Sequence, residues 1–333
     1  MDIKKRILWL DIAKAIAIIS VIIGHTIPAG YLSNFILTFH VPIFFIATGF
    51  TIKSISIKDR KEFIKRIIHD IKILIIPYCI AVFLRDIAIS IQYGIPIIEL
   101  LKGLPLKLLW ASPLRNIYCI EVGFVWFLPA IFWAKIIFYI IENVFPSNYK
   151  NIVFLMCIPI SLIISSICPL PQVLDIALIG TFFVFIGRFL RNNINIFDLD
   201  NSKNNIILYV SFFVWIFCWI GLNINLNMAY RLYPYGILSI IEAICGSICI
   251  FYLSKAIESQ RFINNLMVKI GQQTLIILIV HSIEDILLAN YWHSTQFPYL
   301  ISIVRVIFVV SISLIISAIK KLFSKIKTEK PRI

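Results

Sequence analysis

The chain is poor in charged residues, and this scarcity excludes most soluble classes of protein. Only 14% of its 333 residues are charged, whereas 60% are hydrophobic. A soluble domain could not hide this much apolar surface from water. No polar stretch is long enough to fold as a separate soluble domain. The composition therefore predicts an all-α, polytopic membrane protein with one transmembrane domain over residues 1–320 and a basic cytoplasmic tail over 321–333.

Other common signatures are also missing. The seven cysteines are scattered without a CxxC pair, which argues against a disulfide framework or a zinc site, so we expect no metal. Three basic residues, Lys4, Lys5 and Arg6, precede an apolar stretch that is too long for a signal peptide and has no small-x-small cleavage site. We interpret that stretch as a retained first span. The chain lacks the internal repeat found in many transporters.

Long apolar stretches predict about ten transmembrane helices. Residues 53–72 are basic, but their apolar positions recur at helical spacing, which indicates an amphipathic interfacial helix. Residues 92–121 contain several Pro and Gly and are interpreted as a loop or re-entrant segment. The predicted spans cover residues 8–27, 34–52, 73–91, 122–142, 151–168, 172–190, 206–222, 233–253, 271–290 and 298–318.

The net charge of +14 is distributed asymmetrically about these spans. With ten spans both termini lie on one side, and that side carries 23 basic residues against 6 on the other. This asymmetry follows the positive-inside rule and predicts cytoplasmic termini in a cell membrane of the bacterial (inner) type. It also explains the basic charge through topology, so we expect no nucleic-acid partner. Lys14 then lies toward the cytosol, and His25 and His40 lie toward the outer face.

The first span carries ionisable groups although it is otherwise built from Ile, Ala and Val. Such groups are costly in lipid and normally face a protein interior or a hydrated cavity. At about 100° per residue, the eleven steps from Lys14 to His25 end about 20° past three full turns, and Asp11 lies within about 40° of His25. These residues form one polar stripe. At ~1.5 Å per residue it places Lys14 and His25 ~16 Å apart along the helix.

The first two spans resemble the membrane acyltransferase-3 family, and within it the fucose 4-O-acetyltransferase-like branch. The resemblance rests on WLDIAK ending at Lys14, on His25, and on FHVPIFFIATG at residues 39–49. Many relatives carry Arg where Lys14 stands; Lys is a point charge and lacks the guanidinium fork. Weaker matching pieces continue along the chain in the family's order: Pro77-Tyr78, Trp126-Phe127-Leu128-Pro129, Gly187-Arg188, Gly271-Gln272-Gln273-Thr274-Leu275 and His281.

The resemblance implies about ten membrane helices and an enzyme that moves an acyl group, usually acetyl, from cytoplasmic acyl-CoA to a hydroxyl of a surface or lipid-linked glycan. It also implies that the first-span cation and histidine, here Lys14 and His25, take part in the activity. The expected partners are therefore acyl-CoA (acetyl-CoA as donor), a glycan acceptor and the lipid bilayer.

The stripe suits this chemistry, and we assign candidate roles accordingly. We expect the CoA phosphates to bind Lys14, Arg66 and Arg188, the pantetheine arm to run along the stripe, and His25 to act as general base in a direct transfer. His40 is a second candidate catalytic residue. The candidate substrate-binding residues are Asp11, Glu121, Trp126 and His281.

Each assignment has a structural alternative. A histidine in a helical bundle can simply bridge helices through a hydrogen bond, and an Asp11–Lys14 pair at i,i+3 can be purely stabilising. The basic 53–72 segment can contact anionic lipid alone. A transporter or flippase of a polar or glycan substrate would also use a polar stripe, whereas a receptor or assembly subunit would leave the intramembrane histidines unexplained.

Overall fold

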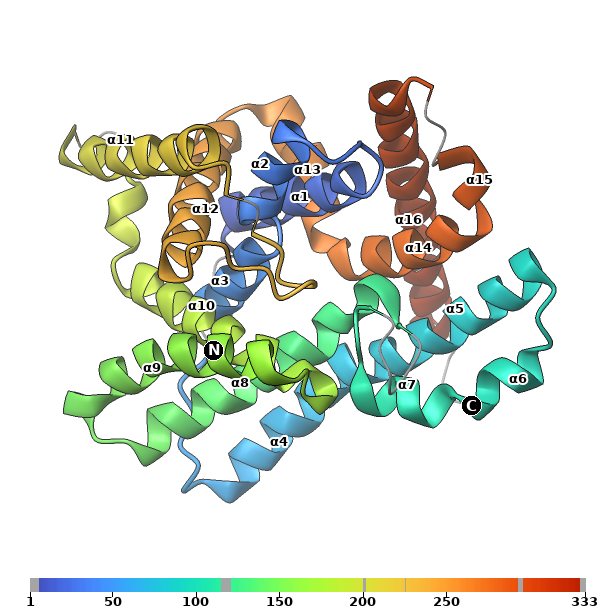
Figure 1. The fold of residues 1–333 in the computed structure, drawn as a ribbon, viewed down its shortest axis with the longest axis horizontal. Coiled ribbons are helices and arrows are strands. Elements are labelled where there is room, and N and C mark those ends of the chain that lie inside the picture. Colours follow the sequence, from blue (N-terminus) through green and yellow to red (C-terminus); the bar gives the residue numbers. More distant parts are fainter. Residues whose placement is uncertain (1–5, 115–120, 200–201, 225, 293–295, 330–333) are drawn as a thin grey trace.

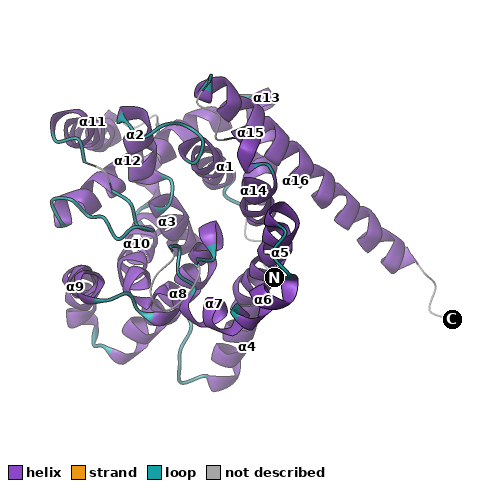
Figure 2. Cartoon of the chain, turned by 45° about the vertical axis from the view of Figure 1, so that its right-hand side comes forward, coloured by secondary structure: helices purple, strands orange, loops and turns teal. Residues whose placement is uncertain are grey.

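A computed structural model describes residues 6–114, 121–199, 202–224, 226–292 and 296–329 (Figure 1). Within these ranges the chain is helical and contains no β-strand, as the colouring of Figure 2 also shows. The predicted all-α fold class is confirmed. The longest helix, α16, extends beyond the rest of the bundle at its C-terminal end (Figure 2).

Seven described helical segments are long and apolar enough to cross a membrane, and an eighth forms if the bent pair Arg261–Gln272 and Thr274–Leu287 counts as one span. Two shorter helical segments, Leu8–Gly24 and Asn205–Gly221, bring these to the ten predicted segments, in the predicted order. The polytopic character expected from the composition is therefore confirmed.

The helices occur in a single series along the chain. The α-helices are α1 (Leu8–Gly24), α2 (Tyr31–Phe39), α3 (Pro42–Thr51), α4 (Arg60–Asp70), α5 (Ile76–Tyr93), α6 (Ile97–Lys102), α7 (Leu104–Trp110), α8 (Phe127–Val144), α9 (Ser147–Ile167), α10 (Leu174–Asn192), α11 (Ser202–Ile216), α12 (Ile237–Glu258), α13 (Arg261–Gln272), α14 (Thr274–Leu287), α15 (Ala289–Trp292) and α16 (Pro298–Glu329). Short 3₁₀ or π segments are η1 (Ile71–Ile75), η2 (Gly123–Trp126), η3 (Pro171–Val173), η4 (Ile194–Phe197) and η5 (Phe217–Gly221).

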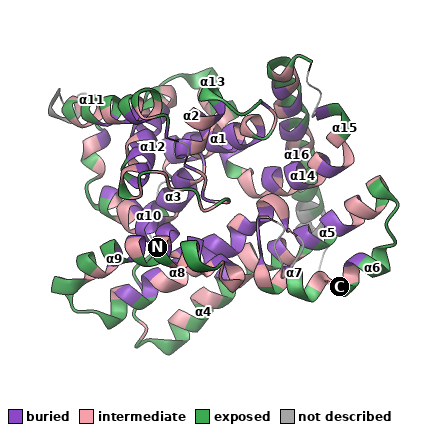
Figure 3. Ribbon diagram, viewed as in Figure 1, coloured by how far each residue is buried: buried purple, intermediate pink, exposed green. Residues whose placement is uncertain are grey.

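Helix α1 lies at the centre of the bundle. It packs against α2, α3, α12, α13, α14 and α16, and most of its residues are buried. Figure 3 shows the same pattern: buried residues concentrate on α1, α3 and α10, whereas α4, α6 and α11 are largely exposed at the periphery. In a membrane protein such exposed apolar helices face lipid, so the polar stripe of α1 must be satisfied inside the protein.

Two glycines allow α3 and α10 to approach closely. A Cβ on Gly49 would collide with the backbone of Gly187 and Arg188, and a Cβ on Gly187 would collide with the carbonyl of Ile46. Small residues at a helix crossing let two backbones come into contact inside a membrane. The crossing holds α3, and with it the end of α2, against the core.

The helix α13–α14 is bent by 69°, at the glutamines that follow Gly271. Gly271 sits directly against the carbonyl oxygen of Asp11, where a Cβ would find no room. The bend brings the start of α14, at Thr274, to the side of α1 that carries Lys14. The sequence-based single span over 271–290 is therefore shorter and begins at this bend.

The predicted boundaries needed further corrections. The interfacial helix expected within 53–72 exists as α4 but runs without a break into the third span, giving one segment from Arg60 to Tyr93. The link is the π-turn η1. Pro77 has no N–H and its ring crowds the carbonyl four residues earlier, and a wider turn relieves that clash. The 92–121 segment holds the short helices α6 and α7, and the last helix continues past residue 320 to Glu329.

Candidate active site

The stripe predicted on α1 begins with an ion-paired lysine. Lys14 Nζ lies 2.7 Å from Asp11 Oδ1, and Arg6 also pairs with the Asp11 carboxylate. Asp11 is buried and lies in the first turn, where a carboxylate is favoured by the helix dipole. Lys14 is about one-quarter exposed, so its ammonium group is held by Asp11 but still open to a ligand.

A cavity of about 510 Å³ runs along this face of α1. It is lined by Lys14, Ile18, Val21 and His25, which recur at i, i+4, i+7 and i+11. The cavity therefore joins the two ends of the predicted stripe. Its size is typical of a small-molecule site. The remaining walls are mainly apolar and come from the α2–α3 break, η1, the segment before α8, the start of α14 and the loop before α12; examples are Leu37, Phe44, Leu74, Ile131, Met228 and Leu278.

His25 ends α1 and is exposed, because its side chain faces the cavity. Its ring stacks on Phe124, with 4.0 Å between centroids, and Phe124 stacks in turn on His281 at 4.7 Å. Gly123 permits this placement of Phe124. Its φ is +63°, and a Cβ there would lie 2.5 Å from the guanidinium carbon of Arg85.

His40 lies at the break between α2 and α3. Pro42 at the first position of α3 cannot donate a backbone hydrogen bond and disfavours helical geometry before it, which explains the interruption. The Nδ1 of His40 is 2.9 Å from the carbonyl oxygen of Ile36. A carbonyl only accepts, so Nδ1 carries the proton and Nε2 keeps the lone pair. The ring lines the same cavity as His25.

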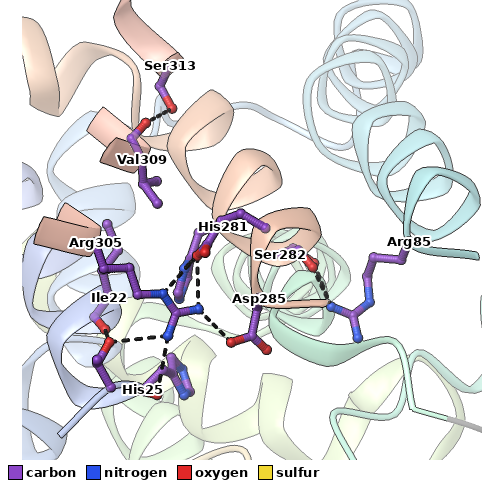
Figure 4. Close-up of polar contacts among 11 residues, drawn as sticks. Ile22, His25, Arg85, His281, Ser282, Asp285, Arg305, Val309 and Ser313 are labelled. Carbon is purple, nitrogen blue, oxygen red and sulfur yellow. Dashed lines mark hydrogen bonds and ion pairs between the residues drawn. The ribbon is translucent and has the colours of Figure 1, made fainter. Parts of the chain in front are cut away.

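A buried charge network lies behind His25 (Figure 4). Arg305 is fully buried and donates to Glu284 Oε1 at 3.0 Å and to Asp285 Oδ1 at 2.5 Å. Its Nη1 donates to Thr26 Oγ1 at 3.2 Å and to the carbonyl of His25 at 3.4 Å. One guanidinium thus joins α16, α14 and the end of α1, and it satisfies a helix-terminal carbonyl that would otherwise lack a partner.

The hairpin loop, residues 226–236, closes one side of the cavity. Its Asn227, Met228, Ala229 and Tyr230 line the cavity wall, and an antiparallel bridge between Asn227 and Leu232 shapes its turn. Arg231 Nε lies 2.6 Å from Asp175 Oδ2 on α10, and Asp175 also accepts from Ser165 and from the backbone N–H of Leu170. This ion pair anchors the loop to the bundle.

The structure brings four of the predicted site residues into one cavity: Lys14, His25, His40 and Trp126. Asp11 lies beside Lys14 without lining the cavity. His281 is fully buried, next to His25 and Phe124 and outside the cavity lining. The substrate-binding roles of Asp11, Trp126 and His281 stay predictions.

Three other predicted residues lie away from this cavity. Arg66 pairs with Asp70 at 3.4 Å. Arg188 donates to the carbonyl of Ile52 at 3.1 Å and to Ser54 Oγ at 2.6 Å, and it lines a second cavity between α8, α9 and α10. Glu121 is partly buried just before η2 but does not line the first cavity. Their assignments to CoA and substrate binding also stay predictions.

Sequence reasoning missed the network around Arg305. Arg305 was counted with the basic residues of the less basic side, although it falls inside the tenth predicted span. Glu284 and Asp285 similarly fall inside the ninth predicted span. Ionisable residues within spans mark functional sites, and that signal was available here. Phe124 and the hairpin loop carried no such signal. Among the described residues, no group of three or more His, Cys, Asp and Glu side chains is arranged to hold a metal ion.

An apolar helical bundle with an imidazole-lined internal cavity is typical of a membrane-embedded enzyme. The family model for an acyltransferase domain, acyltransferase-3, matches residues 7–321, which is nearly the whole chain. The chain therefore belongs to the acyltransferase-3 family, and it is a membrane acyltransferase. No curated protein and no solved structure matches it.

Proposed function

We propose that this acyltransferase moves an acetyl group from cytoplasmic acetyl-CoA to a hydroxyl of a cell-surface or lipid-linked glycan, with His25 as general base. The observation that carries the proposal is the continuous cavity between Lys14 and His25. The resemblance of the first two spans to the fucose 4-O-acetyltransferase-like branch supports acetyl as the acyl group and a sugar as the acceptor. The basic bias of the loops supports placing the Lys14 end in the cytosol.

The donor would enter from the Lys14 end. A cavity of about 510 Å³ is suited to a slender arm and an acyl group, so the nucleotide of CoA would remain outside. Lys14 would contact a phosphate group at the mouth, because an ammonium is a compact positive donor. The apolar walls at Ile18 and Val21 would surround the pantetheine arm and exclude water from the thioester.

The transfer itself needs one proton acceptor. His25 would take the proton from the sugar hydroxyl as its oxygen attacks the thioester carbonyl carbon. The new C–O ester bond forms, the C–S bond breaks, and the imidazolium returns the proton to the departing thiolate to give CoA. His40 would present its Nε2 lone pair to the same space and orient the acceptor hydroxyl. The ~16 Å between Lys14 and His25 would separate donor binding from chemistry.

The experiment uses inverted membrane vesicles from the cells that make this chain, supplied with labelled acetyl-CoA. His25→Ala should abolish label in the glycan fraction while the protein still inserts. His69→Ala is the matched control, because His69 is exposed on α4 and away from the cavity. Full transfer by His25→Ala would refute the assigned base. Glycan that crosses the membrane without label, in wild-type vesicles, would instead support a transporter or flippase.

A further inference from the structure

The proposed base, His25, has a second buried imidazole beside it, and the orientation of that imidazole is fixed. His281 Nδ1 lies 2.7 Å from Glu284 Oε1. Glu284 accepts from Arg305 through the same oxygen, so it acts as a carboxylate acceptor toward both residues. His281 therefore donates through Nδ1–H, and its Nε2 carries the lone pair.

That lone pair has no partner among the described residues. His281 is fully buried, and its Nε2 makes no hydrogen bond within the part of the chain that the structure describes. A buried acceptor without a donor is unfavourable, and such groups in native proteins usually serve a function. The network supplies the opposite end of this imidazole with two strong partners, yet it leaves Nε2 open.

The ring geometry identifies the donor. The centroids of His25, Phe124 and His281 are separated by 4.0, 4.7 and 5.7 Å. If Phe124 lay between the imidazoles, their separation would approach the sum of the two shorter distances. The two imidazoles therefore lie side by side against Phe124. With ring nitrogens little more than 1 Å from each centroid, facing nitrogens would be roughly 3.4 Å apart, which a small ring rotation shortens to hydrogen-bond length.

We propose that His281 is a positioning residue whose Nε2 accepts a hydrogen bond from the His25 ring, and so fixes which His25 nitrogen keeps its lone pair toward the cavity. Glu284 holds the His281 tautomer, and Arg305 holds both Glu284 and the backbone of His25. This arrangement selects the base-competent tautomer of His25 before substrate binds. The inference rests on the proposed function, in which His25 is the base.

The first test reads the tautomers directly. The full chain, in lipid nanodiscs with ¹⁵N-labelled histidine, has only five histidines, so each ring can be assigned by substitution. Protonated and lone-pair nitrogens of a neutral imidazole have well-separated ¹⁵N shifts. We expect His281 with its proton on Nδ1. We also expect the His25 tautomer ratio to change in His281→Phe and to be restored in His281→Gln, whose amide oxygen can replace Nε2 as acceptor. A His281 proton on Nε2 in the wild-type protein, or an unaltered His25 ratio in His281→Phe, overturns the proposal.

The second test separates positioning from stability. In the vesicle assay, His281→Phe should lower kcat by about 10–100-fold, as expected for a partner that orients an imidazole, and leave KM for acetyl-CoA unchanged. His281→Gln should recover much of this loss. Lys107→Gln is the control, because it breaks a buried ion pair with Asp86 between α5 and α7. The proposal fails if the two His281 variants lose kcat equally and only in proportion to thermal stability, as this control does. Absence of transfer in the wild-type protein would refute the proposed function, and the ¹⁵N measurement would still decide the role of His281.

Discussion

Replacing Val21 with tryptophan should close the cavity between its two ends. Val21 lies on the cavity wall, about 10 Å from Lys14 and about 6 Å from His25 along α1. An indole at this position would project into open space rather than into packed side chains, so the fold should tolerate it. The donor thioester would then stop several ångströms short of His25.

The size of the expected effect follows from this geometry. Displacing reacting groups by only about 1 Å costs on the order of 10²-fold in rate, because near-attack alignment is lost. A block several ångströms from the base should therefore reduce acetyl transfer below detection. Val21→Ala enlarges the cavity and should keep most of the activity, and Val21→Phe should fall between the two.

Labelled acetyl-CoA in inverted vesicles measures this series, with glycan-bound label as the readout. Ile80→Trp is the control for adding an indole to the protein, because Ile80 is exposed on α5 and faces away from the cavity. Full transfer by a stably inserted Val21→Trp variant would contradict the route along α1. The donor and acceptor would then have to meet elsewhere.

Three further changes test the surroundings of the cavity. Lys14→Ala should weaken acetyl-CoA binding by roughly tenfold or more, in line with a charge-assisted contact of about 1.5–3 kcal/mol, and Lys14→Arg should bind well; filter binding of labelled donor would show no difference if Lys14 only stabilises α1. Gly271→Ala forces a methyl group against the Asp11 carbonyl and should cost about 1–3 kcal/mol, seen as a lower Tm, whereas Gly30→Ala, with nothing nearby, should not. Asp175→Asn removes the carboxylate that anchors the hairpin loop, so hydrogen exchange there should speed up; unchanged protection would argue against that anchor.

The opening segment shows how far sequence periodicity could go. Helical arithmetic placed Lys14 and His25 on one face of a single helix, and the cavity does line that face. It could not reveal Phe124, because a 3₁₀ turn before α8 has too few residues to show a period. Arg66 and Arg188 were grouped with Lys14 by charge alone. Tertiary packing directs them to Asp70 and to the 52–54 backbone instead, and no pattern within one helix reports such long-range partners.

The interruptions in the helices explain why the site lies where it does. Non-helical backbone is tolerated at membrane depth only where it is buried in protein or lines a cavity, since lipid cannot satisfy free N–H and C=O groups. Here α1 ends at His25, α2 breaks at His40, and α13 breaks before Thr274; all three places border the one cavity. At two of these breaks a backbone carbonyl accepts from a side chain: Ile36 from His40, and His25 from Arg305. The same bonds that stabilise broken helices therefore also orient the imidazoles, so structural and chemical roles coincide in these residues. A variant that restored a continuous helix at such a break would remove the imidazole orientation together with the strain.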